Sequence, residues 1–229
     1  MTAERLSIVL MTFGVSPKRQ EYAFATVRSL CENLAADSVV GWYIADAGSS
    51  KGYVDDLRAL ILGAEQSIIG YHNVWQSAGA NWNMGHEAAF KVSDVVLHME
   101  DDFALQRPLD IRNYQAVLEE RKDIGVIRLG LLPINLRAMT VGARGEIFLD
   151  IDKSVNYAWS GNPCLMHRRW WDKVGPFPVD LAPGETEVAY DGRLRRMQDA
   201  PAIWRPIDLG SYSPFGHIGD EQSYEKEKA

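Results

Sequence analysis

The stretch Asp94-Val95-Val96-Leu97-His98-Met99-Glu100-Asp101-Asp102 places a short apolar run directly before three carboxylates. The valine, leucine and methionine residues of this run predict a buried strand. In open α/β sheets, ligands bind just beyond the carboxyl ends of the strands. The acidic triplet therefore marks an expected ligand-binding position, provided that the rest of the chain builds such a sheet.

The sequence around this stretch alternates between strand-like and helix-like segments. Short apolar runs predict strands, and apolar residues at helical spacing predict helices. This alternation predicts a mainly parallel sheet with helices on both faces. The predicted strands cover residues 6–11, 39–45, 67–71, 94–99 and 125–129, and the predicted helices cover residues 18–35, 54–62, 81–92 and 109–121.

The second half of the chain is less regular. Residues 131–160 contain short strand-like pieces, including Glu146–Leu149, and helices are expected near residues 168–174 and 186–197. Because no linker or repeat is evident, we expect a single domain over residues 1–229. This domain divides into an α/β half at about 1–130, an irregular half at about 131–217 and a polar tail at about 218–229.

The composition argues against several classes of protein. With 24 Lys and Arg residues against 31 Asp and Glu residues, the formal net charge of −7 disfavours broad coating of nucleic acid or anionic lipid. No apolar run of about 18 residues occurs, so no membrane span is expected. Cys31 and Cys164 are too few for a disulfide framework or a thiolate zinc site. We therefore expect a soluble, cytoplasmic protein with reduced thiols.

Two further polar segments follow predicted strands, namely Thr12-Phe13-Gly14 and Asp46-Ala47-Gly48-Ser49. The Asp46 carboxylate can accept a hydrogen bond from a nucleobase N–H, although this segment also fits a simple turn. The acidic triplet suits a hard cation such as Mg²⁺ or Mn²⁺. Its alternative interpretation is a solvated loop in which Asp102 caps a helix.

Several familiar catalytic and cofactor-binding motifs do not occur in the sequence. The chain lacks the GxGxxG dinucleotide loop, the GxxxxGK[ST] phosphate loop and the GxSxG nucleophile elbow. His86-Glu87 also fails the HExxH zinc pattern, because no second histidine follows at the required spacing.

Taken together, the polar segments resemble the GT-A glycosyltransferases, especially their family 2-like branch. The Thr12 and Asp46 segments are similar to the family's nucleotide-binding loops, and Glu100-Asp101-Asp102 is similar to its Asp-x-Asp motif. The resemblance spans about residues 6–223 and implies a GT-A, Rossmann-like α/β fold with a smaller acceptor-side half. The other similar segments are Asn81–Gly85, Trp159–Pro163, Arg168–Arg169, Val174–Phe177, Gly184–Glu187 with Arg193, and Phe215–Gly219.

The resemblance implies a hexosyltransferase-type enzyme that moves a sugar from a nucleoside diphosphate donor to an acceptor hydroxyl with inversion. A UDP-sugar is the favoured donor, and Mn²⁺ or Mg²⁺ held by Asp102 and His217 would neutralise the departing diphosphate. Either Glu185 or Glu187 would remove the acceptor proton. The implied donor-binding residues are Thr12, Phe13, Gly14, Asp46, Gly48, Ser49, Asn81, Glu100 and Asp101, and the implied acceptor-binding residues are Trp159 and Asn162.

Several alternatives stay open. A sugar-nucleotide nucleotidyltransferase usually has a glycine-rich basic loop after its first strand, whereas Thr12–Arg19 contains one glycine. A non-catalytic nucleotide- or glycan-binding module is the non-enzymatic alternative. The acceptor stays open among a glycan, a small molecule and a hydroxylated nucleobase in DNA. Arginines 168, 169, 193, 195 and 196 fit either a solvated helix face or a site for a phosphate-bearing acceptor.

Overall fold

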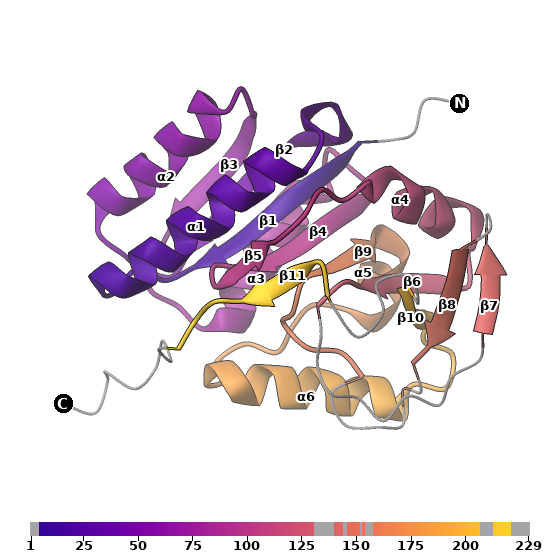
Figure 1. Cartoon of the computed structure of the whole chain (residues 1–229). Helices are drawn as coiled ribbons and strands as arrows, with labels where there is room; N and C mark the ends of the chain where they lie inside the picture. Colours follow the sequence, from indigo (N-terminus) through magenta and orange to yellow (C-terminus); the bar gives the residue numbers. More distant parts are fainter. Residues whose placement is uncertain are drawn as a thin grey trace.

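The computed structural model describes residues 5–130, 140–143, 146–151, 153, 158–206 and 213–220 (Figure 1). Within these residues, nine strands form one sheet in the order β3-β2-β1-β4-β9-β6-β10-β8-β7. The strands are β1 (Leu6–Thr12), β2 (Val39–Asp46), β3 (Ile68–Asn73), β4 (Val95–Glu100), β6 (Ile124–Arg128), β7 (Thr140–Ala143), β8 (Glu146–Asp150), β9 (Cys164–His167) and β10 (Ala202–Pro206). A separate two-stranded sheet joins β5 (Phe103–Leu105) to β11 (Phe215–His217).

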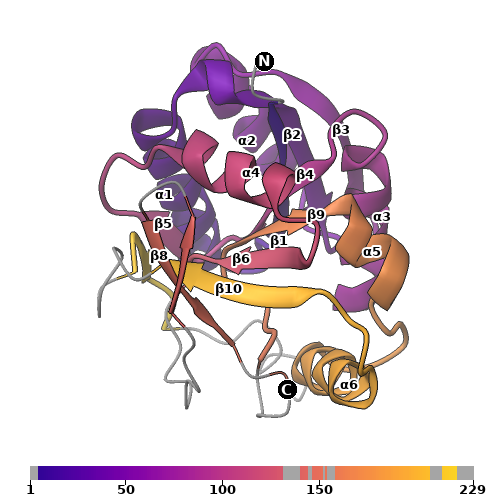
Figure 2. The same cartoon turned by 90° about the vertical axis from the view of Figure 1, so that its right-hand side faces the viewer.

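Helices cover both faces of the large sheet, as Figures 1 and 2 show. One face packs against α1 (Pro17–Asn33), α2 (Lys51–Gly63) and α4 (Ile111–Glu120), and the other packs against α3 (Ala78–Ala89), α5 (Arg168–Val174) and α6 (Pro183–Arg196). A short 3-10 helix, η1 (Ala36–Ser38), leads into β2. The predicted α/β fold is therefore confirmed.

The central strand β1 shows why the sheet forms. Ile8 and Leu10 point into the core under α1 and α2, whereas Val9 points into the core under α3, and all three side chains are fully buried. Burying each such side chain contributes about 1.5–3 kcal/mol. A strand that is apolar on both faces is stable only between two layers of helices, which is how the chain arranges it.

The two halves of the sheet differ in strand direction. β1 pairs in parallel with β2 and β4, and β2 pairs in parallel with β3. β9 then runs antiparallel between β4 and β6, and β8 runs antiparallel between β10 and β7. Strands β5, β9, β10 and β11 were not predicted. β9 is only four residues long and continues directly into α5, so it is too short to show the alternation of apolar and polar residues that predicts a strand.

The topology gathers the predicted polar segments at one edge. β1, β2 and β4 are adjacent and parallel, so the residues that follow them lie side by side. Asp46 is in register with Thr12, and Glu100 is in register with Met11. Among the described helices, none is long and apolar enough to cross a membrane.

Candidate functional site

Asp101 ties three segments together at the carboxyl edge of the sheet. Its Oδ2 accepts hydrogen bonds from Thr12 Oγ1 at 2.8 Å and from the Phe13 backbone N–H at 2.9 Å. Its Oδ1 forms an ion pair with Arg19 on α1. Burial raises the pKa of Asp101 to about 6, while the Arg19 charge acts in the opposite direction. Both oxygens of Asp101 are thus engaged within the protein.

Asp102 is held differently. Its Oδ2 lies 3.0 Å from Arg19 Nη1 and 3.4 Å from His217 Nε2. Its Oδ1 is buried and has no hydrogen-bond partner among the described residues. His217 reaches this position because β11 pairs with β5, and because the Ile218 N–H donates to the Asp102 carbonyl at 2.8 Å. The structure therefore brings together the two residues that the sequence predicted as metal ligands.

The Asp102 site fits a hard cation that takes most of its ligands from elsewhere. In the described part of the chain, no group of three or more His, Cys, Asp and Glu side chains is arranged to hold a metal ion. Mg²⁺ and Mn²⁺ accept carboxylate oxygens together with phosphate oxygens and water. The unpartnered Asp102 Oδ1 is a suitable first ligand, and His217 can supply a second.

Asp46, the last residue of β2, resembles Asp102 in using only one of its two carboxylate oxygens within the described residues. Its Oδ2 accepts from the N–H groups of Gly48 and Ser49, at 3.0 and 2.7 Å, and its Oδ1 is buried without a partner among the described residues. Burial raises the pKa of Asp46, and these hydrogen bonds oppose that effect. Gly48 has φ +89°, and a Cβ there would lie 3.1 Å from the Trp75 backbone nitrogen, so the turn favours glycine.

Aromatic rings stand beside this turn. Phe13 and Trp75 have ring centroids 5.2 Å apart, and Trp75 is 62% exposed. Ser49 links the surrounding loops, because its Oγ accepts from the Gly14 N–H at 2.7 Å and its carbonyl accepts from Asn73 Nδ2 at 2.8 Å. Trp75 was not predicted, although its position just after the third strand was a usable signal. The exposed Trp75 ring, with half-buried Phe13 beside it, offers a surface on which a planar base can stack.

Asn81 lies beneath the β3–α3 loop and is fully buried. Its Oδ1 contacts His72 Nε2 at 2.6 Å and accepts from Gln76 Nε2 at 2.8 Å. Its Nδ2 donates to the Gln76 carbonyl at 3.3 Å. Asn81 therefore shapes the loop that carries Trp75, and its polar atoms are used within the protein.

The carboxylates of Glu100 on β4 and Glu187 on α6 lie close together beside the loop that leads into β9. Glu187 on α6 accepts from the Gly161 N–H, and a Cβ on Gly161 would lie 2.6 Å from Glu100 Oε1 and 2.9 Å from Glu187 Oε1. Only glycine lets the loop pass this closely. Burial raises the pKa of Glu187, and burial together with the Glu187 charge raises the pKa of Glu100.

The two candidate bases are separated by the structure. Glu187 is half-buried beside Glu100, whereas Glu185 is exposed in the first turn of α6. The Glu185 Oε2 accepts from the Ala182 N–H at 3.3 Å, which satisfies a free donor at the helix start. Glu185 therefore acts as a cap, and of the two glutamates Glu187 is the one beside the acidic triplet.

Arg128, a buried residue that was not predicted, holds the loop at residues 158–161 that contacts Glu187. Arg128 donates to the Ala158 carbonyl and to Ser160 Oγ, both at 2.9 Å. Trp159 is 0% exposed and packs against Phe177 and other rings, so here it supports the loop and offers no surface to an acceptor. Asn162 is also buried, and its Nδ2 donates to Ser160 Oγ at 2.8 Å.

Four of the five arginines noted in the second half have contacts that explain them structurally, including Arg195, whose Nε lies 3.6 Å from Asp191 Oδ2 on the same helix. Arg169 donates to the carbonyls of Leu118 and Ile124, each at 2.7 Å. Arg193 donates to the Pro176 carbonyl at 2.6 Å. Arg168 pairs with Asp94. These contacts fix helix ends and loops.

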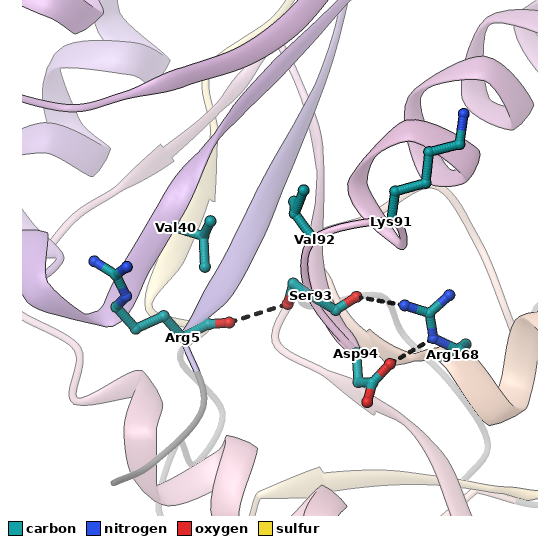
Figure 3. Close-up of a pocket in the computed structure, with 7 residues that line it drawn as sticks. All are labelled: Arg5, Val40, Lys91, Val92, Ser93, Asp94 and Arg168. Carbon is teal, nitrogen blue, oxygen red and sulfur yellow. Dashed lines mark hydrogen bonds and ion pairs between the residues drawn. The ribbon is translucent and has the colours of Figure 1, made fainter.

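Figure 3 shows a pocket around Arg168 at the amino ends of β1 and β4, opposite the acidic turn. Arg168 Nη2 donates to the Ser93 carbonyl at 3.4 Å, and Ser93 Oγ donates to the Arg5 carbonyl at 3.0 Å. The charged ends of Arg5 and Lys91 point away from each other (Figure 3). The cationic groups do not converge on one point, so we do not assign this pocket as the functional site.

No protein-family model matches the sequence, and no curated protein matches it. The fold, however, is similar to several solved structures. These include S. aureus TarS 1-349 in complex with UDP-GlcNAc (TM-score 0.65, 12% identity, 95% of this chain and 61% of that one). They also include the mannosyltransferase PcManGT from Pyrobaculum calidifontis with GDP-Man and Mn²⁺ (0.56, 14%, 82% and 52%) and GalNAc-T7 with UDP, GalNAc and Mn²⁺ (0.65, 11%, 97% and 45%).

The chain spans about half the length of these proteins, between 45% and 61%. The matches cover 82% to 97% of this chain. These likenesses show that the chain has the GT-A fold of the glycosyltransferases.

Proposed function

We propose that this chain is a glycosyltransferase that moves a sugar from a nucleoside diphosphate donor, with UDP-sugars favoured, to an acceptor hydroxyl. One observation carries the proposal. Asp46 at the end of β2 and Asp102 just after β4, the two strands that flank β1 in this GT-A fold, each keep one buried oxygen without a described partner. Burying an unpaired carboxylate oxygen is costly, so both positions favour a ligand that supplies donors or positive charge.

The base-binding part of the proposal rests on Asp46. Its Oδ1, which has no described partner, can accept from the ring N–H of uracil, while the rings of half-buried Phe13 and exposed Trp75 can stack on the base. Thr12, Gly14 and Ser49 hold the loops beside Asp46 through the contacts described above. Bound UDP-GlcNAc in the similar TarS structure supports this choice of donor class.

Asp102 and His217 would hold Mn²⁺ or Mg²⁺ beside the diphosphate. When bound, such an ion supplies Lewis-acid neutralisation of the charge that develops on the leaving diphosphate. Mn²⁺ in the similar PcManGT and GalNAc-T7 structures supports a divalent cation. Glu100 and Asp101 shape the turn that presents Asp102, and the Arg19 ion pair holds that turn in place.

Glu187 would act as the general base. Its carboxylate accepts the acceptor hydroxyl proton as the hydroxyl oxygen bonds to the anomeric carbon and the bond from that carbon to the diphosphate breaks. A single displacement of this kind inverts the anomeric configuration. The raised pKa of the half-buried Glu187 supports this role, because it makes the carboxylate a stronger base.

The first experiment is thermal unfolding with a panel of UDP-, GDP- and other nucleotide sugars, each with and without Mn²⁺. A donor at 100 times its dissociation constant should add about 2.7 kcal/mol to the free energy of unfolding. We expect one nucleotide to stabilise the protein in a Mn²⁺-dependent way. Asp46→Asn should weaken the preference for that nucleotide, whereas Asp55→Asn on the surface of α2 should change nothing. Equal, Mn²⁺-independent responses to every nucleotide would contradict the proposed donor site.

A further inference from the structure

Arg19 is a buried cation placed between the two aspartates of the acidic turn. It is 7% exposed and comes from the first turns of α1. Its Nη2 pairs with Asp101, and its Nη1 lies 3.0 Å from Asp102 Oδ2. Thr26, two helical turns further along α1, donates to the Asp101 carbonyl at 3.0 Å. One face of α1 thus fixes the acidic turn at two points.

This arrangement neutralises part of the carboxylate charge without a metal ion. Burial disfavours the charged guanidinium, but the charges of Asp101 and Asp102 outweigh burial and raise the pKa of Arg19. Asp101 has both oxygens engaged by Arg19, Thr12 and the Phe13 N–H. An incoming cation is therefore left with Asp102 and His217, and it must bind beside a fixed positive charge.

We propose that Arg19 is an internal counter-cation that makes binding of the divalent cation depend on the bound nucleoside diphosphate. Without nucleotide, Arg19 occupies Asp102 Oδ2 and repels a second cation. The diphosphate adds negative charge and oxygen ligands, so that the guanidinium and the divalent cation can share the site. This inference rests on the proposed donor site at Asp46 and Asp102, but it concerns the cation requirement alone.

The arrangement has a reciprocal consequence. If nucleotide strengthens cation binding, then the cation must strengthen nucleotide binding by the same factor. Arg19 would therefore keep the site from holding a divalent cation when no donor is present. It would also keep Asp101 and Asp102 paired while the site is empty of ligand.

The test is isothermal titration of MnCl₂ into the wild-type protein, Arg19→Gln and Arg19→Lys, each with and without saturating UDP. In the wild type, UDP should lower the apparent dissociation constant for Mn²⁺ by about tenfold or more. Arg19→Gln should bind Mn²⁺ without UDP, about tenfold more tightly than the wild type does. Arg19→Lys keeps the charge and should keep the UDP requirement. Arg58→Gln, which removes an exposed arginine paired with Asp55, is the matched control and should behave as wild type.

Two results would overturn the inference. One is wild-type protein that binds Mn²⁺ equally well with and without UDP. The other is folded Arg19→Gln that still needs UDP. Should Arg19→Gln fail to fold, the wild-type comparison and Arg19→Lys decide the question. Failure of UDP to bind the wild type would count against the proposed donor site instead, and Mn²⁺ binding gained by Arg19→Gln would then still support the role of Arg19.

Discussion

The two sides of β4 are built in different ways. On the proposed donor side, Thr12 and Asp46 end parallel strands, Asp101 follows a third, and backbone N–H groups hold the two carboxylates. On the proposed acceptor side, Glu187 comes from a helix, and its neighbour Gly161 comes from a loop before the antiparallel strand β9. The donor side is thus set by strand topology, whereas the acceptor side depends on packing between distant segments.

The difference suggests separate roles that substitutions can test. Changes on the donor side should alter which ligand binds and how tightly. Changes on the acceptor side should alter turnover or the stability of the packing that holds Glu187.

The largest expected effect is that of Asp102→Asn, which keeps the volume but removes the charge. We expect turnover of the donor to fall about 1000-fold, or ~4 kcal/mol in activation free energy, because the leaving diphosphate loses its stabilising cation. The measurement is release of UDP at saturating donor and Mn²⁺. Asp220→Asn, which alters an exposed carboxylate paired with Lys18, is the control. Unchanged turnover in Asp102→Asn would remove Asp102 from the mechanism.

The next effect concerns the acceptor-side core. His86 is fully buried against Trp171, and burial lowers its pKa to about 4. Between about pH 4 and pH 6.5, the His86 side chain is therefore protonated in the unfolded chain but neutral in the folded protein. The free energy of unfolding should be at its full value above about pH 6.5 and should fall by about 3 kcal/mol as pH drops to about 4.

Urea unfolding across this pH range, compared between the wild type and His86→Phe, measures the His86 contribution. The aromatic substitution should remove most of it, since a phenyl ring does not titrate. An identical pH dependence in a folded His86→Phe protein would show that other groups, such as His167, cause the loss.

Asp46→Asn should have a smaller, purely donor-side effect. The amide that replaces the carboxylate offers a weaker acceptor to a base N–H, so donor affinity should fall by about 1.5–3 kcal/mol. The ratio between UDP-sugar and other nucleotide sugars should fall with it. Calorimetric titration of each nucleotide checks this, and turnover at saturation should change little. Loss of turnover without loss of affinity would contradict the assigned role.

Glu185→Ala should have the smallest effect. Removing the helix cap should cost about 0.5–1 kcal/mol of unfolding free energy. Donor affinity and turnover should match the wild type, because Glu185 is exposed and its carboxylate binds the Ala182 N–H. Thermal unfolding and UDP release in one preparation test both parts. A large fall in turnover would return Glu185 as the base.

The sequence was informative about the donor side for a physical reason. The carboxyl ends of parallel strands lie at the same edge of a sheet, so the residues after the apolar runs at 6–11, 39–45 and 94–99 had to meet at that edge. The Asp46 and Asp102 positions could therefore be predicted. Their roles as ligand contacts stay predictions.

The acceptor side could not be resolved in the same way. Glu185 and Glu187 differ by two residues on one helix, and only the packing of α6 against Gly161 separates them. The family resemblance implied that Trp159 contacts the acceptor, but its side chain is fully buried. Arg19 and Arg128 were missed because a buried arginine looks like a surface arginine until its partners are known.

The central claim is that one side of β4 binds the donor and the other side removes the acceptor proton. The most direct test is Glu187→Gln, with donor affinity and UDP release at saturating donor measured on the same sample. We predict that donor affinity stays unchanged and that turnover falls by about 10²–10⁴-fold, whether water or an acceptor alcohol supplies the attacking oxygen. Unchanged turnover, or a loss of donor affinity large enough to explain the lower rate, would contradict this division of roles.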